Sequence, residues 1–391
     1  MLRVRQEWID YATYLFAEVA KRRAAFQAAH PEVNVISLGI GDIALPLLPD
    51  IKLAFDSATQ EMTERPIGYG PSQGYDWLRR PLVKVMYTDH GIDWVTEEDV
   101  SIDPGAKEAA GGFVPELFTC VTDAMIITPA YPVYGDTCTL VRGMPIKWLE
   151  ATAENDFRPM PPEDGEPCVI YLCYPNNPTG QHATREYLKA WVDFALKTGS
   201  IIIYDVAYAD FIQDPDLPRS IYEIPGAEHC AIEMGSFSKW AGFTGLRCSW
   251  TIVPPELKFA GSTEYNLAQI WKKRLNVRTN GVPYPVQRAA QQALEPGVRR
   301  KLLEEQVGYY MNNAALIGQA CEEMGWPCAG GINSPYIWAK VGGDSWEFFD
   351  SMLEKGVVCT PGSGFGDPGQ GYVRYSSFGE EALVEEAVSR F

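Results

Sequence analysis

The stretch Val169-Ile170-Tyr171-Leu172-Cys173 is a short apolar run that ends at a turn rich in proline and asparagine, residues 174–180. A helix is predicted over residues 184–197, and Gly199 ends it. A second apolar run, Ile201-Ile202-Ile203-Tyr204, follows directly. Two apolar runs joined by a helix predict a β-α-β unit with parallel strands and a right-handed crossover. The chain is therefore expected to have an α/β fold with a mainly parallel sheet.

Polar residues follow these two strands. Asn177 lies in the turn after the first strand, and Asp205 and Tyr208 follow the second. Ligands of parallel sheets bind at the carboxyl ends of the strands, so the three side chains are expected in one crevice. A carboxylate at the end of a buried strand is unfavourable without a cationic partner. Asp205 is therefore a candidate to bind a cationic ligand, and the alternative is that it caps a helix.

A third apolar run, residues 230–234, predicts a strand that stops at Gly235. In Ser236-Phe237-Ser238-Lys239 two hydroxyls then flank one lysine, and Arg247 follows eight residues later. An amine can capture an aldehyde covalently, while hydroxyls and a guanidinium can hold a phosphate, which are the groups that pyridoxal phosphate presents. The alternative is that Lys239 is an ordinary solvated surface lysine.

Further short motifs occur along the chain, namely residues 37–42 (SLGIGD), 68–71 (GYGP), 105–107 (GAK), 131–134 (YPVY), 175–180 (PNNPTG) and 360–366 (TPGSGFG). With residues 236–247, they resemble the class I/II pyridoxal-phosphate aminotransferases of fold type I over nearly the whole chain, and within that family the LL-diaminopimelate aminotransferases most. The resemblance implies a large cofactor-binding α/β domain over residues 46–285. It also implies a small α+β domain built from residues 1–45 and 286–391.

The resemblance also implies roles for individual residues. Lys239 would bind the cofactor and move protons, Asp205 would face the pyridine nitrogen, and Tyr131 would lie over the ring. The other cofactor-binding residues would be Ala106, Lys107, Asn177, Tyr208, Ser236, Ser238, Arg247 and, from a neighbouring subunit, Tyr69. The substrate would be bound by Tyr14, Gly41, Lys107, Asn177, Asn280 and Arg374, the last of which would grip a carboxylate with its planar guanidinium.

The implied activity is transfer of an amino group between an amino acid and 2-oxoglutarate or glutamate. The favoured substrate pair is LL-diaminopimelate and tetrahydrodipicolinate, as in lysine biosynthesis. Three positions depart from the pattern of the resembling enzymes, with Ile67 for arginine, Ser72 for glutamate and Thr279 for phenylalanine. Transamination of another amino acid, or a lyase reaction on the same scaffold, therefore remains an alternative.

The composition narrows the partners and the compartment. A net charge of −18 and a pI of about 4.7 argue against nucleic acid and anionic membranes. No apolar run is long enough to span a membrane, and Glu7 and Asp10 interrupt the segment where a signal peptide would be apolar, so a cytosolic location is expected. Nine cysteines without a Cys-x-x-Cys pair and four scattered histidines predict free thiols and no metal site. The expected partners are small amino and oxo acids and a second copy of the chain, in a homodimer with shared active sites.

Periodicity and turn signals predict the remaining elements. Helices are expected at 11–27, 51–61, 105–118, 286–324, 345–355 and 380–390, and further strands at 100–102, 124–128, 335–340 and 372–376.

Overall fold

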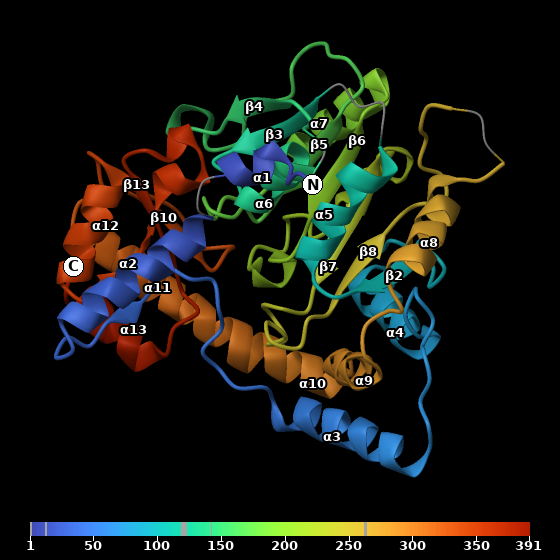
Figure 1. Ribbon diagram of the computed structural model, residues 1–391, viewed down its shortest axis with the longest axis horizontal. Coiled ribbons are helices and arrows are strands. Elements are labelled where there is room, and N and C mark those ends of the chain that lie inside the picture. The colour runs from blue at the N-terminus through green and yellow to red at the C-terminus, as the bar shows by residue number, and fades with distance from the viewer. Residues whose placement is uncertain (1, 12–13, 119–122, 142, 262–263) are drawn as a thin grey trace.

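The computed structural model describes residues 2–11, 14–118, 123–141, 143–261 and 264–391. Its main feature is a seven-stranded sheet with the order β2-β8-β7-β6-β5-β3-β4 (Figure 1). The five strands from β7 to β4 are parallel; β8 pairs antiparallel with β7, and β2 pairs antiparallel with β8 at the edge of the sheet. The strands are β2 Val100–Asp103, β3 Ala124–Thr128, β4 Ile146–Glu150, β5 Val169–Cys173, β6 Ile201–Asp205, β7 Ala231–Ser236 and β8 Ser249–Ile252.

The predicted β-α-β unit is confirmed. Strand β5 pairs in parallel with β6, and α7 (Arg185–Thr198) connects them. The hydroxyl of Thr184 accepts a hydrogen bond from the N–H of Tyr187 at the start of α7, and Gly199 ends it with φ of 72°. Alternate residues of β5 enter two different apolar clusters, Ile170 in one and Tyr171 in the other. Both faces of the sheet are therefore covered, which explains why its strands read as unbroken apolar runs.

Strand β7 differs from the prediction, because it does not stop at Gly235 but runs through it to Ser236. A Cβ atom at Gly235 would lie 2.1 Å from the indole ring of Trp250, which is on the antiparallel neighbour β8. Glycine is needed here for close packing between strands and not for a turn. The prediction was wrong because it took this glycine as the end of the strand. Neither β8 nor β4 was predicted.

Two smaller sheets bring both ends of the chain together. An antiparallel sheet has the order β12-β13-β10-β9, and β1 pairs in parallel with β11. Figure 1 shows the N-terminal helix α2 beside the C-terminal elements, at one end of the molecule. This arrangement agrees with a small α+β unit made from both termini, while the boundaries at residues 45 and 285 stay a prediction. The strands are β1 Ile36–Ser37, β9 Cys328–Gly330, β10 Tyr336–Lys340, β11 Val357–Val358, β12 Thr360–Pro361 and β13 Tyr372–Ser376.

The long helix predicted over residues 286–324 is wrong as one element. Helix α9 ends at Ala293, and α10 begins at Pro296 after Glu295 has taken an extended conformation. Proline has no N–H to continue a helix and disfavours a helical residue before it, so the break falls at Glu295. Beyond α10, one π-helical segment, Leu302–Val307, leads into α11.

The N-terminal helix also differs from its predicted range of 11–27. Helix α2 begins at Leu15, and a separate short helix, α1, ends at Asp10; residues 12 and 13 lie outside the described residues. The helices are α1 Gln6–Asp10, α2 Leu15–Ala29, α3 Pro49–Glu64, α4 Asp76–Met86, α5 Ala106–Leu117, α6 Pro132–Asp136, α7 Arg185–Thr198, α8 Leu267–Arg278, α9 Tyr284–Ala293, α10 Pro296–Lys301, α11 Gly308–Glu323, α12 Ser345–Glu354 and α13 Glu381–Val388.

In the described ranges, none of these helices is both long and apolar enough to cross a bilayer. Eight of the nine cysteines fall within the described residues and are free thiols; seven of them are buried and Cys328 is exposed.

Candidate active site

A cavity of about 380 Å³ lies at the carboxyl ends of the parallel strands. Tyr131 follows β3, Asn177 follows β5, Asp205 ends β6 and Ser236 ends β7. The chain goes from β3 to one neighbour, β4, and then to the other, β5, so the cavity adjoins the point where the strand order reverses. Thirteen of the fifteen residues predicted for the site line it: Tyr14, Gly41, Ala106, Lys107, Tyr131, Asn177, Asp205, Tyr208, Ser236, Ser238, Lys239, Arg247 and Arg374.

Asp205 is a buried carboxylate that lines this cavity. Its Oδ1 accepts the N–H of Ala207 at 3.0 Å, and its Oδ2 accepts the hydroxyl of Tyr134 at 2.8 Å. Burial raises its pKa, and these two hydrogen bonds oppose the rise. Within the described residues no lysine or arginine forms an ion pair with it. The short 3₁₀ helix that follows has Tyr208 at its N-cap position, so Asp205 is not a helix cap.

Lys239 projects its amine into the same cavity. Its Nζ donates a hydrogen bond to the carbonyl oxygen of Gly41, and it lies 5.4 Å from the ring centroid of Phe378. Burial lowers its pKa to about 8, aided by the positive charges of Arg374 and Arg247 and opposed by Asp42. A lysine with this pKa has a substantial fraction of neutral, nucleophilic amine near neutral pH, which an exposed lysine lacks.

One side of the cavity can hold a phosphate. Ser236 and Ser238 are buried, and the N–H of Ser238 donates to the hydroxyl of Ser236 at 3.1 Å. Helix α5 begins next to them at Ala106, after Gly105 with φ of +117°. A Cβ atom at Gly105 would lie 2.1 Å from Nη2 of Arg247, so the guanidinium covers the bare backbone. Backbone N–H groups at a helix start, two hydroxyls and an arginine together form an anion site.

Arg374, on β13, also lines the cavity. It is 1% exposed; its Nη1 donates to Oδ1 of Asn177 and its Nη2 to the carbonyl oxygen of Gly39, both at 2.6 Å. Its Nε is buried and has no hydrogen-bond partner among the described residues. Burial lowers its pKa, which means that the guanidinium carries its charge in a poorly solvated site where an anionic ligand would be strongly bound.

A second cation that could reach a substrate is Lys107, in the first turn of α5. Its Nζ lies 4.9 Å from the ring centroid of Tyr14. Tyr14 is also close enough to Arg374 for that charge to oppose the rise in its pKa that burial causes. The cavity thus has two separate cations near one phenol.

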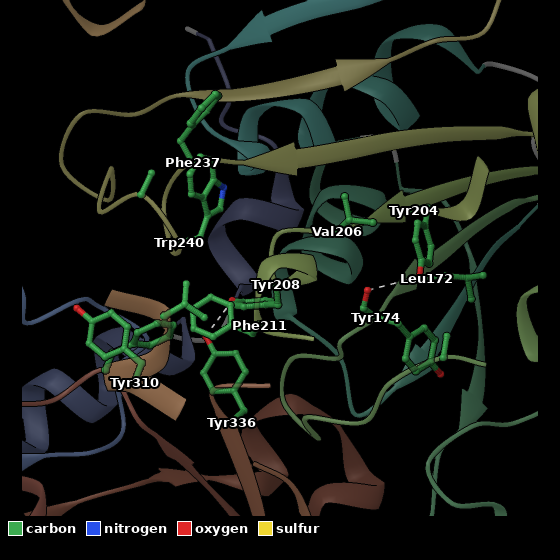
Figure 2. Close-up of a cluster of buried hydrophobic side chains, with 14 of the residues drawn as sticks. Leu172, Tyr174, Tyr204, Val206, Tyr208, Phe211, Phe237, Trp240, Tyr310 and Tyr336 are labelled. Atoms are coloured by element: carbon green, nitrogen blue, oxygen red, sulfur yellow. Dashed lines mark hydrogen bonds between the residues drawn. The ribbon is translucent and has the colours of Figure 1, made fainter. Parts of the chain in front are cut away.

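Several cavity residues were missed from the sequence. Tyr134 lies three residues after the predicted Tyr131, which is the spacing of one helical face, so this signal was available in residues 131–134. Tyr336 had no such signal, because it arrives from the distant strand β10, where its hydroxyl lies 2.8 Å from that of Tyr208 (Figure 2). The other missed lining residues are Phe16, Ile40, Asp42, Ala110, Cys173, Ala207 and Thr244.

Two predicted residues lie elsewhere. Tyr69 is 90% exposed and Asn280 is exposed, and neither lines the cavity. The turns that carry them adjoin, because a Cβ atom at Gly281 would lie 3.0 Å from the carbonyl oxygen of Pro71. The predicted roles of the two residues stay predictions.

The residues present fit pyridoxal phosphate. The buried carboxylate of Asp205 without a cationic partner suits a protonated ring nitrogen, the amine of Lys239 suits an aldehyde, and the anion site with Arg247 suits a phosphate. The phenols of Tyr131 and Tyr208 and the amide of Asn177 line the same cavity as these groups.

Comparison with known proteins agrees with this fit. The model of the family described as aminotransferase class I and II matches residues 33–391. Two proteins named LL-diaminopimelate aminotransferase, from Desulfosudis oleivorans and Desulfotalea psychrophila, are 44% and 42% identical, over 100% of this chain and 98% of each relative.

Solved structures agree as well. That of L,L-diaminopimelate aminotransferase from Chlamydomonas reinhardtii superposes with a TM-score of 0.93 at 36% identity, over 100% of this chain and 98% of that one. An aspartate aminotransferase from Thermus thermophilus shares the fold, with a TM-score of 0.87 over 100% of this chain and 99% of that one, at 18% identity. The chain belongs to the class I and II aminotransferases, which are pyridoxal-phosphate-dependent enzymes of fold type I.

Proposed function

We propose that this aminotransferase moves an amino group between LL-diaminopimelate and 2-oxoglutarate, with tetrahydrodipicolinate and glutamate as the other pair. The identity of 44% to a relative of that name, over the full length, supports the proposal. The observation that carries it is the pair of cations in one cavity, Arg374 and Lys107, each of which lies near Tyr14. LL-diaminopimelate has a carboxylate at each end, so each cation would bind one of them.

The residues of the chain have distinct tasks in this proposal. Bound pyridoxal phosphate supplies an electron sink for the charge that develops at the substrate Cα atom. Nζ of Lys239 would accept the proton from Cα of the amino donor and, in the opposite half-reaction, would give a proton to Cα of the amino acid formed from the oxo acid, which a pKa of about 8 favours because the amine can exist in either state near neutral pH. The carboxylate of Asp205 stabilises positive charge on the ring nitrogen, and Arg374 orients the α-carboxylate.

Recognition of the far ammonium group has to differ from that of the resembling enzymes, because Ser72 replaces their glutamate. Gly281 packs against the backbone of Pro71 and Ser72, so the segments 69–72 and 279–281 adjoin and form one patch, and none of these residues lines the cavity of their own chain. We propose that the enzyme is a homodimer in which this patch completes the cavity of the second copy. Tyr69, with 90% of its surface exposed, would then contact the phosphate of the neighbouring site.

Steady-state kinetics with a panel of amino donors tests the substrate. We expect kcat/KM for LL-diaminopimelate to exceed that for glutamate, aspartate, lysine and ornithine by at least about tenfold, or roughly 1.4 kcal/mol of transition-state binding. Lysine is the sharpest comparison because it differs from LL-diaminopimelate only by lacking the distal carboxylate. Lys107→Met should therefore lower kcat/KM for LL-diaminopimelate more than it lowers kcat/KM for lysine. A better rate with any other donor would contradict the proposed substrate and leave the family assignment intact.

The cytosolic location expected from the sequence also stays a prediction.

A further inference from the structure

Tyr336 connects the small antiparallel sheet to the cavity. It is the first residue of β10 and is 1% exposed. Its hydroxyl lies 2.8 Å from that of Tyr208, and the two rings meet edge to face with centroids 5.1 Å apart (Figure 2). Tyr208 comes just after β6, so this contact joins residues 128 positions apart.

The ring of Tyr336 also contacts the arginine proposed to bind the substrate. Cζ of Arg374 lies 4.4 Å from the centroid of this ring. A guanidinium over an aromatic face is attracted to it, most strongly where water is excluded. Nη1 and Nη2 of Arg374 hydrogen-bond to Asn177 and Gly39 at the edge of the guanidinium. The ring of Tyr336 contacts the face of the guanidinium and does not compete with these hydrogen bonds.

The hydroxyl of Tyr336 decides where the proton of Tyr208 can point. A phenol has a single proton to donate. If Tyr208 donates into the cavity, its oxygen must accept the hydrogen bond that joins it to Tyr336, and Tyr336 must be the donor. The same hydroxyl lies next to Gly41, which is predicted to bind the substrate, since a Cβ atom at Gly41 would lie 2.5 Å from it.

We propose that Tyr336 is a positioning residue that couples the two halves of the site. Its hydroxyl directs the proton of Tyr208 into the cavity toward the cofactor, and its ring face holds Arg374 in place for a substrate carboxylate. The inference rests on the cofactor and substrate roles proposed above for Tyr208 and Arg374, but not on the identity of the amino donor.

Two substitutions separate the two contacts. Tyr336→Phe removes the hydroxyl and keeps the ring, whereas Tyr336→Leu removes both. Tyr208→Phe is the reference for the cofactor half. Tyr375→Phe is the matched control, because Tyr375 is a buried tyrosine of the same sheet whose hydroxyl has no hydrogen-bond partner in the part of the chain that the structure describes.

Three readouts are used, namely the dissociation constant of the apoprotein for pyridoxal phosphate by fluorescence titration, the pH midpoint of the visible absorbance of the holoenzyme, and KM for the best amino donor. We expect Tyr336→Phe to weaken cofactor binding about fivefold, the value of one neutral hydrogen bond, and to shift the pH midpoint while KM stays within about twofold. Tyr336→Leu should in addition raise KM by about fivefold or more. Tyr375→Phe should match the wild type in all three.

The outcomes distinguish the inference from its premise. If Tyr208→Phe leaves cofactor affinity unchanged, the proposed role of Tyr208 is wrong. If Tyr208→Phe weakens binding but Tyr336→Phe equals the wild type, the coupling through the hydroxyl is overturned. If Tyr336→Leu raises KM no more than Tyr336→Phe does, the ring contact with Arg374 is overturned. Thermal melting verifies folding of each variant, and Tyr336→Met replaces Tyr336→Leu if the latter does not fold.

Discussion

The hydroxyl of Tyr134 donates a hydrogen bond of 2.8 Å to Oδ2 of Asp205. Tyr134 belongs to α6 and its ring stacks on that of Tyr171 at 5.0 Å, so the donor is fixed by packing on the face of the sheet opposite to Tyr208. The carboxylate is consequently held by α6 as well as by the backbone N–H of Ala207. Both bonds favour its charged form against the effect of burial.

Replacing the carboxylate should separate cofactor binding from catalysis. We expect Asp205→Asn to bind pyridoxal phosphate but to lose at least about 100-fold in kcat, or about 2.7 kcal/mol, because an amide cannot stabilise positive charge on the ring nitrogen. Tyr134→Phe should lose less, since it removes only one bond to the carboxylate. Single-turnover absorbance measures both variants. A kcat of Asp205→Asn near that of the wild type would show that the carboxylate has only a structural role.

The pKa of Lys239 predicts how the apoprotein captures its cofactor as the pH changes. Burial places this pKa near 8, below the ordinary value of 10.5 for a lysine, and the neutral amine is the nucleophile. The fraction of neutral amine rises with pH through that pKa, so the rate of capture of pyridoxal phosphate should rise with a midpoint near pH 8. Stopped-flow absorbance of the apoprotein measures it. A rate that still climbs steeply above pH 9 would indicate an ordinary, solvated lysine.

The anion site can be tested at Gly105. Gly105→Ala should abolish tight cofactor binding, because the new Cβ atom would collide with Nη2 of Arg247 and the backbone would be strained at φ of +117°. Gly91→Ala is the control, since Gly91 also has a positive φ but nothing within 4 Å of an added Cβ atom. From backbone strain Gly91→Ala should lose about 1 kcal/mol of stability, and Gly105→Ala more, because φ of 117° and ψ of 146° at Gly105 lie in a region that only glycine adopts readily. Equal cofactor affinity in the two variants would contradict the assignment of the phosphate site.

Mixed dimers test whether the active sites are shared. In Tyr69→Phe the proposed contact with the neighbouring phosphate is lost, and in Lys239→Ala the catalytic amine is lost. Mixing the two inactive or weakened homodimers should produce hybrid dimers in which one site has both native residues, so activity should rise as subunits exchange. Sedimentation at the assay concentration verifies the assembly. A monomer, or no change of activity upon exchange, would contradict the shared site.

Local sequence patterns predicted most of the site because many of its residues follow strands that are apolar throughout. Residues 169–173 and 201–204 could be read as buried strands, and the polar residues after them necessarily meet at one edge. The individual roles, however, came from the resemblance to a family and not from the patterns themselves. Tyr134 could have been found from its helical spacing to Tyr131.

The remaining features depend on long-range packing. Nothing near Tyr336 in the sequence indicates that its hydroxyl meets Tyr208, because the contact exists only once the small sheet lies against the cavity. The prediction that the strand stops at Gly235 failed for a similar reason. The ring that requires glycine there belongs to Trp250, on a strand that was not predicted. The break at Glu295 was different, because Pro296 was visible in the sequence and should have divided the predicted helix.

We propose that Lys239 binds pyridoxal phosphate and releases it to an amino donor during transamination. Borohydride reduction of the holoenzyme, followed by peptide mass spectrometry, tests this role because reduction makes the bond between lysine and cofactor permanent. We expect the cofactor to be attached to Lys239, prior incubation with LL-diaminopimelate to prevent the attachment, and added 2-oxoglutarate to restore it. Attachment to another lysine, or attachment to Lys239 that no amino donor prevents, would show that Lys239 does not have this role.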